Sequence, residues 1–501
     1  MKFTSLRFLS VCCFALLGTI TDASKASTTF SATSDSFKLP RTVEAQLKKL
    51  ELPSSALSVV VLPAQGDRAV LSHQADRSFT PGSSIKLITS FIALDKLGPN
   101  YKWKTQFLSD AVIRDGVLSG NLYLRGGGDP NLSYDKFALM LRALRQLGIR
   151  EIQGDLILDR SFFQPARPEI GAPAFDESPD AYYNVIPDAL LIHSNITAFA
   201  INSDSKDKNE NPTTVQVQTP NDNLLLRNQL TLNNRPCADW KSQWQSPQTL
   251  VNEQGQIEIT LSGSFPKNCQ ALAYLNVIER NAYIASLFRG LWKELGGNWQ
   301  GNVYGGTTPF NASLLHERTS ETLAETLRIV NKNSDNAMAR ILYLSLGAES
   351  LAAKNFSDTK QAAFAEIRNW FARNGLSAEG IVMENGSGLS RTERISANQM
   401  ASVLRVAAGS LWYPEFASSL PIAGIDGTMK NRLKAGNAEA RARIKTGTLR
   451  NSIAVAGYVR DTSQTDWIIV AFINTPDSAA SRGRPVLDEL INWVASGRSN
   501  D

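Results

Sequence analysis

The chain has 501 residues, of which 43% are hydrophobic and 20% are charged, and its formal net charge is +5. This length exceeds one ordinary domain core, so two or three domains are expected. The composition excludes a disordered chain, and no lysine- or arginine-rich run points to nucleic acid as a partner. The mild positive excess suits contact with an anionic polymer and equally suits an ordinary solvated surface.

The first residues predict export from the cytoplasm. Lys2 and Arg7 precede an apolar run at residues 8–17, and small and polar residues follow it. The run is too short to span a bilayer, so residues 1–23 are interpreted as a secretory signal peptide, with an uncleaved anchor as the alternative. Residues 24–40 are rich in Ser and Thr and predict a flexible lead-in. We therefore expect a periplasmic or otherwise extracytoplasmic protein with at most loose membrane association.

The cysteine and histidine content bears on disulfides and metals. Without the signal peptide, Cys237 and Cys269 remain, and two cysteines in an exported chain most simply form one disulfide. Two thiols, three histidines in the whole chain and no His-Glu-x-x-His pattern argue against a metal site. No cofactor is predicted.

Hydrophobic patterning predicts the secondary structure in chain order. Strands at residues 56–62 and 69–71 form a hairpin with a turn at 65–67, and an apolar helix runs from Ser83 to Leu97. The remaining expected elements are a strand at 122–125, a helix at 134–147, strands at 155–158, 214–218 and 257–261, helical stretches at 282–295 and 321–346, a three-stranded meander at 442–448, 452–459 and 467–472, and a final helix at 486–494.

The order of these elements predicts one domain interrupted by an insertion. The first hairpin is too small to be stable alone, so the final three strands are expected to complete its sheet, with the first and last helices covering the faces. Residues 41–103 and 280–501 would then form the catalytic domain. Residues 104–279 would form the insertion, and two modules are expected in it, an α/β one at about 104–186 and a mostly β one at about 187–279.

A Ser-x-x-Lys pair opens the apolar helix, in the stretch TPGSSIKLITS. Residues three apart share a helix face, so the Lys86 amine can reach the Ser83 hydroxyl, and a helix start favours a developing oxyanion. The ordinary interpretation is a capped helix with one solvated lysine. The pair is weak alone, because further copies look like loops or helix surfaces: Ser133/Lys136, Ser203/Lys206, Ser205/Lys208, Ser264/Lys267 and Ser357/Lys360.

Two further motifs follow in the order used by active-site serine acyl-transferases. Ser334 and Asn336 match Ser-x-Asn within the helical stretch, where the ordinary interpretation is a polar cap or a break between helices. Residues 445–448 read Lys-Thr-Gly-Thr on an expected strand, where a lysine often protects an exposed edge from aggregation. Gly447, however, also marks a place where another group approaches the strand backbone closely.

With these motifs, the chain resembles the low-molecular-mass class C penicillin-binding proteins, which are serine D-alanyl-D-alanine carboxypeptidases/endopeptidases. The wide separation of Ser83 from Ser334 is similar to that class, as are residues 127–130, 386–391 and 423–428. The resemblance covers nearly all of the mature chain. It implies an α+β fold of the β-lactamase/transpeptidase type, an antiparallel sheet covered by helices, with a large and partly all-β insertion.

The resemblance and the chemistry together assign the catalytic roles. Ser83 would attack the carbonyl between two D-amino acids, and Lys86 would take its proton. The required neutral amine is expected from burial and from the nearby charge of Lys445. Ser334 would relay the proton to the leaving amine, and Asn336 would hold Lys86 or the substrate amide.

Recognition of the substrate is assigned to the third motif and to the turn at 386–391. Lys445, Thr446 and Thr448 suit a terminal carboxylate, with Gly447 beside them. The backbone N–H groups of Ser83 and Thr448 would form the oxyanion hole.

The resemblance also implies contacts with the side chain of the stem peptide. Arg391 is the candidate for that contact, and an acidic residue of the insertion, either Asp176 or Asp180, would meet its amino end. Asn385 departs from the aspartate that relatives often show at that position, so the charge near Arg391 is expected to differ.

The expected partners are peptidoglycan muropeptides, with β-lactam antibiotics as covalent inhibitors. A serine β-lactamase is the rival enzyme, although no Glu-x-x-Leu-Asn pattern lies between the second and third motifs to supply a deacylating base. A Ser-His-Asp hydrolase would need a Gly-x-Ser-x-Gly turn, which the sequence lacks. A non-catalytic wall-binding protein of the same fold is the remaining alternative.

Overall fold

The computed structural model describes residues 38–168, 170–173, 175–204, 212–253, 256–350, 355–476 and 478–498. The predicted signal peptide and most of the predicted lead-in lie outside these residues. Within the described ranges, no helix is both long and apolar enough to cross a membrane.

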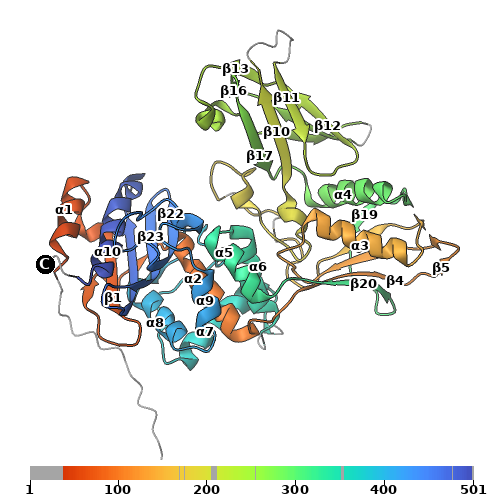
Figure 1. Cartoon of the computed structure of the whole chain (residues 1–501). Coiled ribbons are helices and arrows are strands. Elements are labelled where there is room, and N and C mark those ends of the chain that lie inside the picture. The colour runs from red at the N-terminus through yellow and green to blue at the C-terminus, as the bar shows by residue number, and fades with distance from the viewer. Residues whose placement is uncertain are drawn as a thin grey trace, which may run out of the picture. The chain divides into compact units, whose positions relative to one another are not determined.

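Helices occur along the whole described chain (Figure 1). The α-helices of the described residues are α1 (Arg41–Lys49), α2 (Lys86–Leu97), α3 (Tyr134–Gln146), α4 (Arg280–Glu294), α5 (Leu323–Lys332), α6 (Asn336–Ala348), α7 (Thr359–Arg373), α8 (Ala397–Ala408), α9 (Tyr413–Ser419) and α10 (Arg484–Ala495). Of these, α1, α7, α8 and α9 were not predicted from the sequence.

A five-stranded antiparallel sheet unites the two ends of the chain. Its strand order is β2 (Leu71–His73), β1 (Leu57–Pro63), β24 (Asp466–Asn474), β23 (Ser452–Arg460) and β22 (Ala442–Leu449). Strand β1 therefore pairs with β2 and with β24, the last strand of the chain. The prediction that the final three strands complete the sheet of the first hairpin is confirmed.

Both faces of this sheet are buried, because alternate residues of each strand point to opposite sides. On one face, Val60 and Val470 belong to a hydrophobic cluster that includes α2 and α8. On the other face, Val59 and Ile469 pack with α1 and α10. Figure 1 shows these helices on the two sides of the sheet. The expected cover by the first predicted helix, which is α2, and by the last helix, α10, is confirmed, and the α+β fold class with it.

The middle of the chain builds a separate hydrophobic cluster from residues between Phe107 and Trp299. Its strands are β4 (Lys104–Ser109), β5 (Ile113–Arg114), β6 (Val117–Leu118), β7 (Leu122–Gly126), β8 (Glu151–Ile152), β9 (Leu156–Asp159), β10 (Thr197–Ser203), β11 (Thr213–Val217), β12 (Leu224–Asn228), β13 (Thr231–Asn233), β14 (Gln248–Val251), β15 (Ile257–Leu261), β16 (Ser264–Pro266), β17 (Gln270–Leu275), β18 (Asn298–Trp299), β19 (Val303–Gly305) and β20 (Ser313–Thr319). The exact bounds of the predicted domains stay predictions.

These strands form several small sheets. The orders are β19-β9-β7-β4-β20, β18-β8-β6-β5, β11-β10-β17, β12-β15-β14 and β13-β16. The predicted disulfide between Cys237 and Cys269 is present in this mostly β part of the chain. A two-stranded pair of β3 (Ser78–Phe79) and β21 (Ile395–Ser396) lies outside it.

Two helical predictions need correction at the residues that matter for the site. The stretch at Ser83 begins as a 3₁₀ turn, η2 (Gly82–Ile85), and becomes α-helical only at Lys86. The stretch at 321–346 is not continuous, since α5 ends at Lys332 and α6 begins at Asn336. Ser334 in between has the left-handed φ of 58°, which an α-helix does not accommodate.

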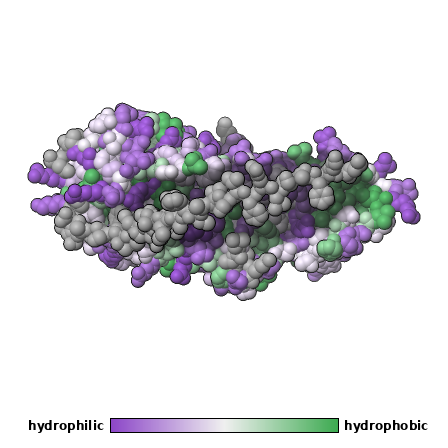
Figure 2. Space-filling view, turned by 90° about the horizontal axis from the view of Figure 1, so that it is seen from below, coloured by the Kyte–Doolittle hydropathy of each residue, from purple (hydrophilic) through white to green (hydrophobic). Residues whose placement is uncertain are grey.

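Figure 2 shows hydrophilic and hydrophobic residues interspersed over one face of the molecule. Exposed large hydrophobic side chains such as Val112, Phe310 and Leu411 belong to different segments of the chain. Single exposed apolar side chains are normal in folded proteins and carry no functional implication here.

Candidate active site

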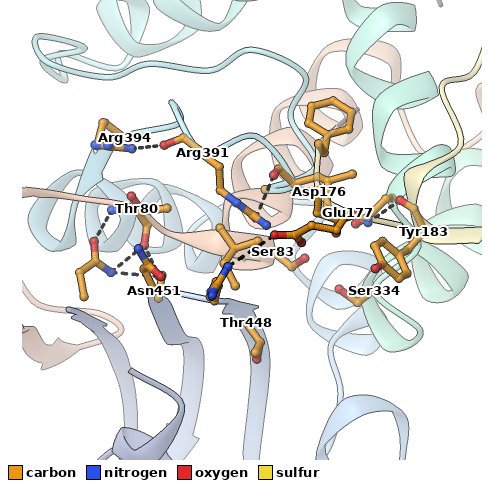
Figure 3. A pocket seen from close by; sticks show the side chains of 18 of the residues that line it. Thr80, Ser83, Asp176, Glu177, Tyr183, Ser334, Arg391, Arg394, Thr448 and Asn451 are labelled. Carbon is orange, nitrogen blue, oxygen red and sulfur yellow. Dashed lines mark hydrogen bonds and ion pairs between the residues drawn. The ribbon is translucent and has the colours of Figure 1, made fainter. Parts of the chain in front are cut away.

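The three sequence motifs meet at one cavity of about 850 Å³. Ser83, Ser334, Asn336 and Thr448 line it, although these residues are separated by up to 365 positions in the chain (448 − 83). Figure 3 shows Ser83 between Thr448 on one side and Arg391 and Asp176 on the other, with Ser334 nearby. The fold therefore brings all three motifs together.

The Ser83 hydroxyl and the Lys86 amine are in direct contact. Lys86 Nζ donates to Ser83 Oγ at 2.9 Å and to Asn336 Oδ1 at 2.7 Å. It also donates to the backbone carbonyl of Ser387. The 3₁₀ turn explains the contact, because residues i and i+3 lie directly above one another in this conformation. Lys86 is 0% exposed, so the interpretation as a solvated helix-surface lysine is wrong.

The surroundings of Lys86 favour its neutral form. Burial lowers the pKa of Lys86 to about 7, against the opposing charges of Asp335 and Glu393. Burial and the charge of Lys86 lower the pKa of Lys445 well below its ordinary value. Burial is thus the main cause of the lowered pKa of Lys86. The repulsion between the two ammonium groups contributes to the lowered pKa of Lys445.

The second and third motifs are joined by one hydrogen bond. Lys445 Nζ donates to Ser334 Oγ at 2.9 Å and to the backbone carbonyl of Thr446 at 2.9 Å. The turn that presents Ser334 is held by Asp335, whose carboxylate caps α6 by accepting the Met338 N–H at 2.8 Å. The break in the helix therefore aims the Ser334 hydroxyl at the strand that carries Lys445.

The strand β22 approaches the nucleophile so closely that glycine is required. A Cβ on Gly447 would lie 2.4 Å from the Pro81 carbonyl oxygen and 3.0 Å from the Ser83 nitrogen. A Cβ on Gly82, which has a φ of +51°, would lie 3.2 Å from the Thr448 nitrogen. The prediction of a close approach at Gly447 is confirmed. The same geometry brings the backbone nitrogens of Ser83 and Thr448 to one edge of the cavity.

Of the remaining predicted residues, Thr448 and Arg391 line the cavity, and Thr446 is not among its lining residues. Thr446 Oγ1 donates to Thr428 Oγ1 at 2.8 Å, while Thr448 is exposed and lines the cavity. Arg391 also lines the cavity and donates to the Leu389 carbonyl at 3.2 Å.

The two candidate acidic residues of the inserted region differ in position. Asp176 lines the cavity, and its Oδ1 accepts hydrogen bonds from the Ser178 N–H at 3.0 Å and the Asn184 side chain at 2.6 Å. Asp180 is not part of the cavity lining described here and accepts from the Ser246 hydroxyl at 3.3 Å. Of the two candidates, Asp176 is therefore the one that lines the cavity among the described residues.

Sequence reasoning missed three supporting groups. The Ser387 carbonyl accepts from Lys86, the Tyr183 carbonyl accepts from Asn336 Nδ2 at 2.9 Å, and Thr428 contacts Thr446. Ser387 and Thr428 lie in the stretches 386–391 and 423–428, which the resemblance had already singled out. The contact of the Tyr183 carbonyl could not be predicted, because every residue has a backbone carbonyl and the sequence does not distinguish one from another.

The described residues include no group of three or more His, Cys, Asp or Glu side chains placed to hold a metal ion. The cavity is instead lined by hydroxyl, amide, guanidinium and carboxylate groups. Such a set suits a polar organic substrate.

Comparison with known families decides which family this site belongs to. Residues 39–495 match the D-Ala-D-Ala carboxypeptidase 3 (S13) family. The chain belongs to this family. Among curated family relatives, the D-alanyl-D-alanine carboxypeptidase of an Actinomadura species is 27% identical over 445 residues, which cover 84% of this chain and 78% of that protein. The D-alanyl-D-alanine carboxypeptidase DacB of Haemophilus influenzae is 25% identical over 463 residues, covering 88% and 90%.

A solved structure shows the same fold over most of the chain. The crystal structure of penicillin binding protein 4 from Haemophilus influenzae superposes with a TM-score of 0.75 and 23% identity, covering 90% of this chain and 99% of that one. The S13 family fold therefore includes the middle region as well as the sheet that carries the motifs.

Proposed function

We propose that this protein is a serine D,D-peptidase that removes terminal D-alanine from peptidoglycan stem peptides or cleaves D-alanyl cross-links between them. One observation carries the proposal. In a member of the S13 family, a fully buried Lys86 donates to the hydroxyl of Ser83 at 2.9 Å. A buried amine with its pKa at about 7 is suited to activate a serine.

Acylation begins when Ser83 Oγ attacks the carbonyl carbon between the two D-amino acids. Lys86 Nζ takes the hydroxyl proton, and the carbonyl oxygen becomes an oxyanion. The backbone N–H groups of Ser83 and Thr448 would donate to that oxygen, and the close approach of β22 to the turn at Gly82 supports this assignment.

Collapse of the tetrahedral intermediate expels the leaving amine. The proton taken by Lys86 must reach this nitrogen, and Ser334 can relay it because its hydroxyl accepts from Lys445 and can donate onward. Asn336 holds Lys86 in place through its Oδ1. Water then attacks the ester on Ser83, with Lys86 again taking a proton, and releases the shortened peptide.

The terminal carboxylate is the natural partner of Lys445. Burial, together with the charge of Lys86, lowers the pKa of Lys445 and so disfavours its ammonium form. A bound carboxylate would raise the pKa of Lys445 and restore its charge. The hydroxyls of Thr446 and Thr448 lie on the same strand and would complete the contact.

The far side of the cavity suits a side chain that ends in both an amine and a carboxylate. Arg391 and Asp176 carry opposite charges and both line the cavity. In the proposed substrate, the side chain of the stem-peptide residue before the cleaved bond would place its carboxylate near Arg391 and its amine near Asp176.

These assignments imply the partners and location of the protein. Muropeptides would be substrates and β-lactams covalent inhibitors, in line with the Haemophilus influenzae relative, which has also been solved with a β-lactam. Peptidoglycan lies outside the cytoplasm, and the Cys237–Cys269 disulfide is compatible with an oxidising compartment. We propose an extracytoplasmic, periplasmic location, with export directed by the signal peptide at residues 1–23.

The test combines a labelled penicillin with defined muropeptides. Mass spectrometry is expected to find a long-lived adduct on Ser83 in the wild type and in Ser84→Ala, a neighbouring serine whose hydroxyl donates to the Pro81 carbonyl. Ser83→Ala should show no adduct and no release of D-alanine or of cross-links. Rapid loss of the label would favour a β-lactamase, and absence of any adduct in the wild type would favour a non-catalytic wall-binding protein. Equal muropeptide cleavage by Ser83→Ala would overturn the proposal.

A further inference from the structure

A buried carboxylate lies behind the turn of residues 385–388. Glu393 is 0% exposed, and its Oε1 accepts the backbone N–H groups of Asn385 at 3.2 Å and of Gly386 at 3.0 Å. Its Oε2 is also buried and has no hydrogen-bond partner among the described residues. A buried carboxylate that is only half satisfied is costly, so its presence here calls for a functional reason.

The turn held by Glu393 carries the carbonyls that contact the nucleophile and its base. The Ser387 carbonyl accepts from Lys86 Nζ and, at 3.4 Å, from Ser83 Oγ. The Gly386 carbonyl accepts from Thr89 Oγ1 at 2.7 Å, one helical turn beyond Lys86. The carboxylate of Glu393 therefore bonds the backbone one and two residues before the Ser387 carbonyl.

The packing of this turn leaves little freedom to move. Gly386 has a φ of +68°, and a Cβ there would lie 2.6 Å from the Thr89 hydroxyl. A Cβ on Gly388 would lie 2.1 Å from the Gly82 carbonyl oxygen and 2.5 Å from the Ser83 nitrogen. Any displacement of the turn would thus displace the backbone of the nucleophile.

Glu393 also faces the charges of the site. The charged and titratable groups that act on it are Lys86 of α2, Glu384 of its own loop, and Arg340 and Tyr343 of α6. Burial raises the pKa of Glu393 to about 7, against the two backbone hydrogen bonds and the charge of Lys86.

Lys86 in turn experiences charges from three elements. Asp335 at the start of α6 and the anion of Glu393 favour its ammonium form, while Lys445 of β22 is repelled by it. Because an anionic Glu393 favours the protonated amine, its charge contributes, after burial and Asp335, to how much free Lys86 base exists near neutral pH.

We propose that Glu393 is a positioning residue of this site, which anchors the turn of residues 385–388 beneath Ser83 and shifts the pH range in which Lys86 acts as base. This inference rests on the proposed function, because it concerns the base of that reaction. It assigns to Glu393 two separable effects, one of hydrogen bonding and one of charge.

Two substitutions separate these effects. Glu393→Gln keeps an acceptor oxygen for the two N–H groups but removes the charge, so the free amine of Lys86 should exist at lower pH. The acid limb of the pH profile for acylation by a chromogenic cephalosporin should then shift down by as much as about one unit near pH 7, which is up to about a tenfold faster rate at a fixed pH there. The shift should be smaller at lower pH, because Glu393, with its pKa at about 7, is itself protonated on the lower part of the limb. Glu393→Ala removes the anchor as well, and the plateau should fall about 100-fold through misplacement of the turn.

Rates are measured from pH 5 to 9 and divided by the fraction of protein that a labelled penicillin titrates, so unfolded molecules do not count. Glu384→Gln is the matched control, because it makes the same change in the same loop at an exposed carboxylate that accepts from the Ser390 and Thr392 hydroxyls. Its acid limb should stay within about 0.3 units of the wild type, since solvent screens exposed charges.

An unshifted acid limb in Glu393→Gln overturns the proposal, even if the variant is less stable, because a merely structural residue would not move the limb. A plateau in Glu393→Ala that stays within twofold of the wild type overturns the anchoring effect. Absence of acylation in the wild type would instead refute the proposed function, so the two failures are distinguishable.

Discussion

Two regions of the molecule bury charged side chains in opposite ways. In the middle part of the chain, Asp188 is buried with Arg160 and Arg280, at 2.7 and 2.9 Å from its Oδ2. Burial opposes ionisation of Asp188, but the charges of the two arginines outweigh it and hold the pKa of this carboxyl below its ordinary value. At the cleft, by contrast, neither Lys86 nor Lys445 forms an ion pair with a carboxylate of the described residues.

The difference distinguishes buried charges that stabilise the fold from buried groups that take part in the reaction. A compensated buried cluster keeps its charges at every physiological pH and holds the chain together. An uncompensated buried amine loses its charge near neutral pH, which is the property that a general base requires. The cost of leaving Lys86 and Lys445 unpaired is therefore tied to catalysis, and substitutions in the two regions should have opposite signatures.

The largest effect on activity is expected from substitution of Lys86, the buried amine that has no ion-pair partner. Lys86→Met removes the base and should slow acylation by a labelled penicillin about 10³-fold, within the range for loss of a general base. Its free energy of unfolding in urea should not fall, because an unpaired buried amine is replaced by an apolar chain of similar length. The exposed lysine substitution Lys102→Met is the control and should change neither quantity. Acylation of Lys86→Met within tenfold of the wild type would contradict the assignment.

The compensated cluster should show the reverse behaviour. Asp188→Asn leaves two arginines buried without their carboxylate and should lower the free energy of unfolding by about 3–5 kcal/mol. Acylation per folded molecule should stay within threefold of the wild type. The exposed substitution Asp110→Asn, in the same region, should change stability by less than about 0.5 kcal/mol. A loss of activity in Asp188→Asn without loss of stability would break the distinction between the two regions.

The pH dependence of stability should also come from the cleft. The pKa of Lys86 is about 7 in the folded protein and 10.5 ordinarily, so between these values only the unfolded chain binds its proton. Stability should therefore rise with pH above 7, by about 1.4 kcal/mol per unit for one such group. Urea unfolding at pH 7.5, 8.5 and 9.5 should show a steeper rise for the wild type than for Lys86→Met. Equal slopes would show that Lys86 is not deprotonated in the folded protein.

The smallest effect is expected where charges are paired but exposed. Arg450 lies 3.4 Å from Glu177 at the rim of the cavity, and the two side chains are 73% and 84% exposed. A double-mutant cycle with Arg450→Ala and Glu177→Ala should give a coupling energy below about 1 kcal/mol, decreasing with added salt. A larger coupling that salt does not weaken would mean that this pair is shielded from water in solution.

Local pattern was enough to predict the elements of the central sheet. Strands β1, β23 and β24 are long, mostly apolar runs, and their burial on both faces follows from that composition. The hydrophobic pattern did not predict the short turn that separates α5 from α6. The break at Ser334 depends on a left-handed residue and on the cap by Asp335, and both are compatible with an uninterrupted helical pattern in the sequence.

The motifs likewise predicted which side chains would gather, namely Ser83, Lys86, Ser334, Asn336 and Lys445. They did not predict the state of those groups. The low pKa of Lys86 comes from its burial, and Asn336 and Ser387, 250 and 301 residues away in the chain, hold its amine in place. The same holds for which of Asp176 and Asp180 lines the cavity, since composition cannot distinguish these two acidic residues.

The sequence by itself therefore determined the identity and order of the reactive groups, because covalent spacing and hydrophobic pattern are local properties. Only the tertiary structure decided how those groups ionise and which of them face the cavity. Burial and Coulomb interactions depend on distances through space, and the buried carboxylate of Glu393 beneath the turn of residues 385–388 becomes visible only there.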